Sequence, residues 1–166
     1  MPNRMLFEYL NWRNEHYCRN LINRNVLVTR TEFIPYCKKA KKNNKTSYKK
    51  NVIWDYPAVA ITSSDNNGQY VCSNYSRAAY VTSFNTLLTN KLNSIDSTKK
   101  IGDVRNKNII GHCAEPHAAN QTMNTFRKKR GHDLSLNLVY FSLALRPRTM
   151  GIIDTCQNCK DTFPNL

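Results

Sequence analysis

The chain has 166 residues, 40% of them hydrophobic, which suffices for one domain that buries its own core. Its 25 lysines and arginines outnumber 11 acidic residues, so the formal net charge is +14. The apolar runs are far shorter than the roughly 20 residues of a membrane-spanning helix, and no signal-peptide stretch stands near the start. Composition therefore excludes a membrane protein and predicts no secretory signal here.

The positive charge is concentrated in the first 50 residues, which hold 12 basic and three acidic residues. Seven lysines lie between Lys38 and Lys50, and a second basic cluster is Arg127 to Arg130. Such a surface attracts a polyanion and binds it with strong salt dependence. Nucleic acid is therefore the expected partner, although a general enrichment in Lys and Asn would produce the same count.

The first half of the chain predicts one helix and one hairpin. Apolar residues at helical spacing predict an amphipathic helix over residues 4–24. Residues 26–31 are β-branched enough for a short strand, whereas residues 38–50 lack periodicity, as in a loop or tether. The runs 56–62 and 69–75 predict a β-hairpin, because the Asn-Asn-Gly between them accommodates positive φ values.

The second half predicts helices around a buried strand. Residues 76–92 suit a helix or mixed structure, and residues 93–108 a polar connection. A helix is predicted over residues 114–130, and a strand covered on both faces over the apolar run 136–145. A short helix over residues 156–163 completes an α/β fold, in which helices flank a mixed β-sheet.

Three of the six cysteines form a pattern with chemical meaning. Cys156 and Cys159 make a C-x-x-C pair, and Cys113 directly precedes the predicted helix 114–130. A C-x-x-C pair alone is ambiguous between a redox dithiol, a disulfide and metal ligands. With a third thiolate it suits a Zn²⁺ site that keeps one position open for catalysis. The alternative is a structural zinc site with four ligands, completed by His112 or His117.

Glu115 favours the catalytic interpretation. It stands two residues after Cys113, and a carboxylate beside a zinc-bound water can take its proton and pass it to a leaving group. The order C-x-E, then C-x-x-C, resembles the zinc-dependent cytidine deaminase-like superfamily. More narrowly, the chain is similar to bacterial polymorphic-toxin deaminases in three segments: Cys113-Ala114-Glu115-Pro116, Pro147-Arg148-Thr149 and Cys156-Gln157-Asn158-Cys159.

The resemblance covers about residues 56–166. It implies a cytidine deaminase-like sheet with the two motifs at the N-termini of two helices, in a deaminase domain over residues 51–166. Residues 1–50 would form a basic N-terminal extension. The resemblance also implies Zn²⁺ as cofactor, Glu115 as proton shuttle and three ligands, Cys113, Cys156 and Cys159. The chain departs from the superfamily at Thr155, where Pro is usual, and in having only seven residues after Cys159.

Substrate contacts are less visible in the sequence. The resemblance implies that an asparagine contacts the sugar and that two arginines lie near the site, where they could bind phosphate. We also expect a tyrosine to stack on an extruded base and two histidines to lie on the substrate side. The candidates are Asn74, Tyr75, His112, His117, Arg146 and Arg148.

The sequence thus predicts a zinc-dependent hydrolytic deaminase that converts cytosine to uracil in nucleic acid, with DNA favoured over RNA. The resemblance further implies a bacterial toxin domain that acts in the cytoplasm of a target cell and meets an acidic immunity protein. Free thiolate ligands favour a reducing compartment. Two alternatives stay open: a deaminase of free nucleosides or nucleotides, and a non-catalytic nucleic-acid-binding module with a structural zinc.

Overall fold

The computed structural model describes residues 3–29, 54–76 and 83–166, which are built around one five-stranded antiparallel sheet. The strands of this sheet are β3 (Ala60–Asp65), β4 (Cys72–Tyr75), β7 (Val139–Phe141), β8 (Ala144–Arg146) and β9 (Gly151–Ile153). Their spatial order is β4-β3-β8-β9, and β7 also pairs with β3. Three further elements form the layers on either side: α1 (Arg4–Asn23), α4 (Ala114–Arg130) and α5 (Gln157–Thr162).

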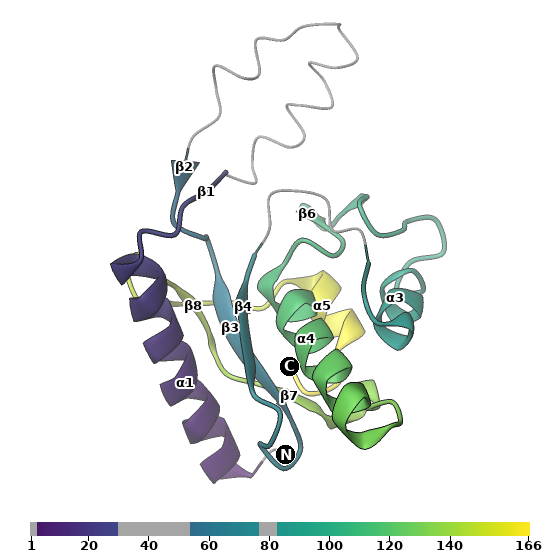
Figure 1. The fold of residues 1–166 in the computed structure, drawn as a ribbon. Helices are drawn as coiled ribbons and strands as arrows, with labels where there is room; N and C mark the ends of the chain where they lie inside the picture. Colours follow the sequence, from purple (N-terminus) through teal and green to yellow (C-terminus); the bar gives the residue numbers. More distant parts are fainter. Residues whose placement is uncertain (1–2, 30–53, 77–82) are drawn as a thin grey trace, which may run out of the picture.

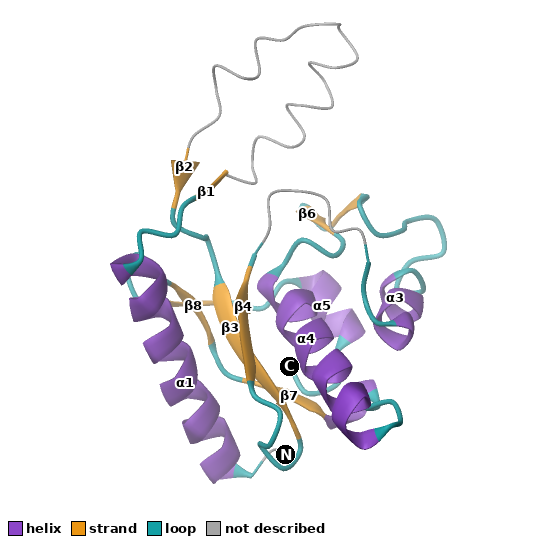
Figure 2. Cartoon of the chain, viewed as in Figure 1, coloured by secondary structure: helices purple, strands orange, loops and turns teal. Residues whose placement is uncertain are grey.

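The sheet lies between α1 on one side and α4 and α5 on the other (Figure 1; Figure 2). Each of its two faces packs against a hydrophobic cluster. Helix α1 packs on one face, where Cys18 and Leu21 meet Ala60 and Leu145. The other face carries the larger cluster, to which α4 and α5 contribute buried residues, among them Met123. None of the helices in the described residues is long and apolar enough to cross a membrane.

Smaller elements complete the described part. Helix α3 (Thr86–Leu92) adds two leucines to the larger cluster. A short ladder joins β1 (Val28–Thr29) to β2 (Trp54–Asp55), and a hairpin joins β5 (Val104–Arg105) to β6 (Asn108–Ile109). One turn of 3-10 helix, Leu136–Leu138, leads into β7.

The three predicted helices over residues 4–24, 114–130 and 156–163 are confirmed by α1, α4 and α5. Helix α4 ends at Gly131, whose φ of 79° lets its N–H reach the carbonyl of Arg127. The predicted loop over residues 38–50 lies outside the described residues, as do parts of the segments 26–31 and 76–92.

The predicted hairpin is confirmed, but β3 continues to Asp65, three residues beyond the predicted strand end at Thr62. The extra residues are polar and fully buried, because their side chains find partners inside the protein. The Ser63 hydroxyl lies 2.8 Å from that of Thr122 on α4. The Asp65 carboxylate accepts from three backbone N–H groups of the following turn, those of Asn67, Gln69 and Tyr70.

The sheet differs from prediction in two respects. Instead of a mixed sheet, every strand pair among the described residues is antiparallel. The run 136–145 is not one strand, since β7 and β8 are separated by Ser142 and Leu143. On β3, Ser63 pairs with Phe141 of β7, whereas Ala60 pairs with Leu145 of β8. The β7–β8 segment therefore has one more residue than the part of β3 that it faces, and this extra residue makes a β-bulge.

Helix α1 satisfies the backbone groups that the bulge leaves unpaired. The Asn14 amide donates to the carbonyls of Ala60 and Leu143, at 3.0 Å each, and Asn14 is fully buried. The side-chain oxygen of Asn11 accepts a hydrogen bond from the backbone N–H of Leu143 at 2.7 Å. Helix α1 is therefore a structural layer of the sheet, although it lies before the predicted domain boundary at residue 50.

We predict that Asn14→Ala lowers the free energy of unfolding by about 2–4 kcal/mol, because two carbonyls and the Thr62 hydroxyl lose a buried partner. Urea denaturation measures the change. Asn20→Ala is the matched control, since Asn20 is exposed on the same helix, and its effect should stay within about 0.5 kcal/mol. Equal effects of the two substitutions would show that Asn14 does not support the bulge.

Candidate metal centre

Three cysteines that are far apart in sequence meet at the start of two helices. Cys113 is the N-cap residue of α4, Cys156 is the N-cap residue of α5, and Cys159 lies in the first turn of α5. Their three sulfur atoms all lie within 4.8 Å of one another, and the Sγ atoms of Cys113 and Cys156 are 3.3 Å apart. This cluster could hold a metal ion.

The backbone explains why these positions favour ionised thiols. Cys113 and Cys156 both have extended φ and ψ values, and neither caps its helix with a side-chain hydrogen bond. The first N–H groups of the two helices therefore face the sulfur cluster with their positive dipole ends. Such an environment stabilises thiolates, which are the metal-binding form of cysteine.

The pKa values within the cluster diverge because the sulfur atoms are so close. Hydrogen bonds from the Cys113 and Cys159 thiols lower the pKa of Cys156 to about 3. The contact with Cys156 and burial raise the pKa of Cys113, and the contacts with Cys113 and Cys156 together with burial raise the pKa of Cys159, both well above their usual range. A bound cation would favour the ionised form of all three thiols.

The donor set fits a zinc ion with an open coordination position. Soft thiolates select zinc and similar metals, and three protein ligands leave room for a fourth, exchangeable one. Among the described residues, neither His112 nor His117 belongs to the group of ligand atoms. The four-ligand structural site considered from the sequence would require one of them.

Glu115 lies beside the sulfur cluster in the first turn of α4 and is only 4% exposed. The Cys159 thiol donates to Oε2 of Glu115 at a sulfur–oxygen distance of 3.6 Å. Burial is the main reason that the pKa of Glu115 rises to about 7, and the negative charge on Cys156 adds to the shift. A carboxyl group with this pKa can both accept and donate a proton near neutral pH.

A cavity of about 340 Å³ opens onto Cys113, Glu115 and Cys156. Its walls come from five segments: the end of the loop before β3, the residue after β4, the β5–β6 hairpin, the start of α4 with the residues before it, and the end of β9 with the segment that joins it to α5. The remaining lining residues are Ala58, Val59, Ser76, Val104, Lys107, Asn108, Ile109, His112, Ala114, Ile153 and Asp154.

The predicted substrate residues are distributed over several parts of the fold. His112 lines the cavity, whereas His117 is buried on α4 with its ring centroid 5.5 Å from that of Phe84. Asn74 donates to the side-chain oxygen of Gln121 at 3.4 Å. Tyr75 packs with the α1 cluster on the other face of the sheet. Of these four candidates, only His112 lines the cavity.

The two predicted phosphate contacts also lie away from the cavity lining. Arg146 is exposed at the end of β8. Arg148 donates to Asp55 at 2.8 Å, which ties the segment after β8 to β2. A substrate role for these arginines, and for Asn74, Tyr75 and His117, stays a prediction.

Sequence reasoning missed the β5–β6 hairpin, because residues 93–108 are polar and were predicted as a connection. The hairpin supplies Val104, Lys107, Asn108 and Ile109 to the cavity. No local pattern signals the hairpin, since Arg105 is paired with two acidic residues, Asp96 and Asp161, that belong to other segments. That pairing is visible only after the chain is folded.

Comparison with protein-family models, with curated proteins and with solved structures finds no match for this chain. What the centre can do is therefore judged from its own geometry. Three converging thiols, a buried carboxyl group and an adjoining cavity suit a metal-assisted hydrolysis in which a proton must be moved.

We predict that Cys113→Ser lowers zinc affinity, because it removes one of three thiolate ligands. The loss should exceed the roughly 10- to 100-fold that is typical when a residue that only supports a ligand is removed. Elemental analysis after dialysis against a weak chelator measures the bound metal. Cys72→Ser is the control, since Cys72 lies on β4 outside the cluster. Equal zinc content in the two variants would contradict the ligand assignment.

We also predict that Glu115→Gln stabilises the metal-free protein by about 1–3 kcal/mol at pH 8. The folded-state pKa of about 7 exceeds the ordinary value of 4.5, so this carboxyl group favours folding only while protonated. Its contribution is present below pH 4.5 and is lost as the pH rises to 7.

Thermal unfolding at pH 4.5 and pH 8 measures this effect, and the difference between Glu115→Gln and wild type should nearly vanish at the lower pH. Glu8→Gln is the matched control, because Glu8 is exposed on α1. A stabilisation that is equal at both pH values would contradict a raised pKa.

Proposed function

We propose that the protein is a zinc-dependent hydrolytic deaminase that converts cytosine to uracil in nucleic acid. The observation that carries the proposal is the 3.6 Å contact between buried Glu115 and Cys159 of the three-sulfur cluster, at the wall of a cavity. A zinc site with a purely structural role would leave the Glu115 carboxyl group without a function, and burying a carboxyl group without a function would only cost folding free energy. The resemblance of the C-x-E and C-x-x-C motifs to cytidine deaminases supports the same conclusion.

The proposed chemistry adds water to cytosine and releases ammonia. A zinc ion on the three thiolates would supply the Lewis acidity that makes water a nucleophile near neutral pH. Glu115 takes the proton that the attacking water loses at C4 of the base and delivers it to the ring nitrogen N3. It then carries the proton of the new C4 hydroxyl to the departing amino group, so that C4 becomes a carbonyl, one water is consumed and one ammonia leaves.

The proposed substrate is a base within a strand, with DNA favoured. A net charge of +14 is more than a pocket for a free nucleoside requires, and it suits a polyanion. A cavity of about 340 Å³ is at the small end of ligand sites, so it would hold one nucleoside unit at a time. The target base must then leave its stack, which is easiest in single strands.

We predict that zinc-loaded protein forms uracil in a cytosine-containing single-stranded DNA and that Glu115→Gln lowers kcat by about 10²–10⁴-fold, because the proton shuttle is lost. Uracil is measured by excision and strand cleavage. The zinc content of the variant should be unchanged, since Glu115 is not one of the three ligands.

The same assay on duplex DNA, RNA and free cytidine separates the alternatives. Product from free cytidine alone would identify a nucleoside deaminase. A zinc-loaded wild type that forms no product on any substrate would contradict the proposal and favour a binding module. Glu8→Gln serves as control, because it removes an acidic group from α1 and should leave the rate unchanged.

A further inference from the structure

The β5–β6 hairpin places one basic side chain at the wall of the cavity. Asn106 and Lys107 form its two-residue turn, and both have positive φ values, 51° and 67°. Two such residues in succession make a type I′ turn, whose twist matches that of the paired strands. Lys107 is exposed and is the single lysine or arginine that lines the cavity among residues 3–29, 54–76 and 83–166.

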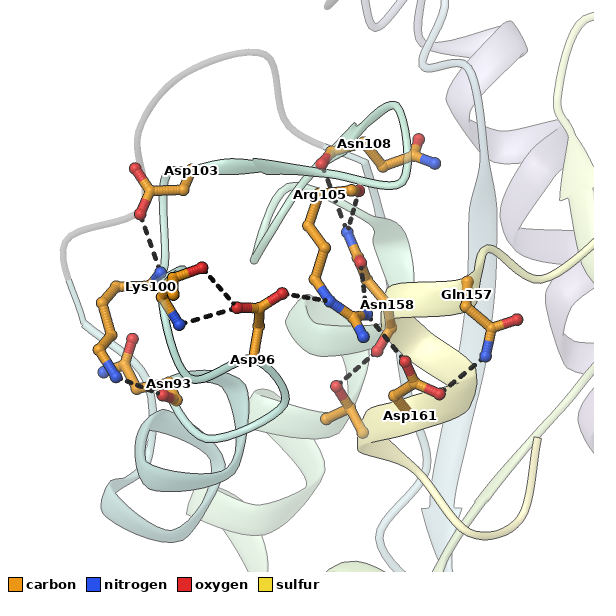
Figure 3. A network of polar contacts seen from close by, with 11 residues as sticks. Asn93, Asp96, Lys100, Asp103, Arg105, Asn108, Gln157, Asn158 and Asp161 are labelled. Atoms are coloured by element: carbon orange, nitrogen blue, oxygen red, sulfur yellow. Dashed lines mark hydrogen bonds and ion pairs between the residues drawn. The ribbon is translucent and has the colours of Figure 1, made fainter.

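The hairpin is fastened to the helix that carries two of the sulfur ligands (Figure 3). Arg105 lies 2.8 Å from Asp161 and 3.3 Å from Asp96, and it donates to the Asn158 side chain at 3.0 Å. Asn158 in turn donates to the carbonyls of Arg105 and Asn108, at 3.0 and 3.3 Å. Both strands of the hairpin are thereby held by α5.

Asn158 has a second property that matters for the site. It is 3% exposed and lies between Cys156 and Cys159 in the C-x-x-C turn. The hairpin is therefore held by residues of the same short helix that carries Cys159, with Asn158 next to that ligand in the sequence. Lys107 is a flexible side chain on a rigid base, placed at a defined position relative to the metal centre.

We propose that Lys107 binds the backbone phosphate adjacent to the nucleotide that occupies the cavity, and so selects a strand over a free nucleoside. This inference rests on the proposed function. A cavity of about 340 Å³ holds one nucleoside, so the neighbouring phosphates of a strand must pass over its rim. Lysine is a point charge with a long reach and can follow a phosphate whose position varies with the sequence.

The charges around the cavity support this role. The other ionisable groups that line it include two carboxylic acids, Glu115 and Asp154, and two of the cysteines. These groups repel a phosphate, and three thiolates around Zn²⁺ would leave the centre with a net charge of about −1. A strand therefore needs a cation where it crosses the rim, and Lys107 provides it.

The test compares Lys107→Ala with wild type on a single-stranded oligonucleotide and on free cytidine. We expect kcat/KM for the oligonucleotide to fall about tenfold, and kcat/KM for cytidine to stay within about twofold. The slope of log kcat/KM against log salt concentration should become shallower by about 0.7, the value for one phosphate contact on a single strand. Lys107→Arg should restore most of the loss.

Lys128→Ala is the matched control, because it removes the same charge from the last turn of α4, roughly 23 Å along the helix from Cys113. Equal losses in Lys107→Ala and Lys128→Ala would overturn the proposal, since only bulk charge would then matter. An equal loss on oligonucleotide and cytidine would also overturn it, because Lys107 would then act on the nucleoside itself.

A binding measurement separates failure of this inference from failure of the proposed function. Fluorescence anisotropy of a labelled oligonucleotide with zinc-loaded wild type and Lys107→Ala needs no turnover. Weaker binding by the variant, with a shallower salt slope, supports the phosphate contact even if no uracil forms. Unchanged binding by the variant contradicts the contact even if the wild type is an active deaminase.

Discussion

The structure depends on holding three cysteine sulfur atoms within 4.8 Å of one another. Buried thiolates repel at that separation, so the fold must supply both the convergence and an environment that favours a cation among them. The chain between Cys113 and Cys156 supplies the convergence. Helix α4 leads away from the centre, β7 and β8 return along β3, and β9 turns the chain so that α5 begins where α4 began.

The two faces of the sheet have different tasks. The face under α4 and α5 carries the three clustered cysteines, Glu115 and the cavity. The opposite face is covered by α1, whose Asn11 and Asn14 satisfy the bulge between β7 and β8. That bulge lies on the path by which the chain returns to the centre, so α1 supports the site from behind the sheet without touching it.

Much of this could be predicted from local sequence, because α4 and α5 combine helical spacing with clear ends and the cysteine motifs stand at their first residues. The burial of polar side chains could not be predicted from local sequence. Ser63 and Asp65 suggest a loop but lie in the central strand, since their partners come from α4 and from the turn. Likewise, Asn14 occupies a core position on α1 only because distant carbonyls need a donor. Interactions of this kind depend on the tertiary fold and leave no local pattern.

The bond between Asn14 and Leu143 joins residues 129 positions apart in sequence. During synthesis α1 emerges well before residues 139–146, which form the strand edge that it completes. Contacts of such long range slow folding, because the connecting loop must close before they form. Helix α1 therefore keeps a half-apolar face uncovered until β7 and β8 have been made, and the sulfur cluster can assemble only after α5 has followed them.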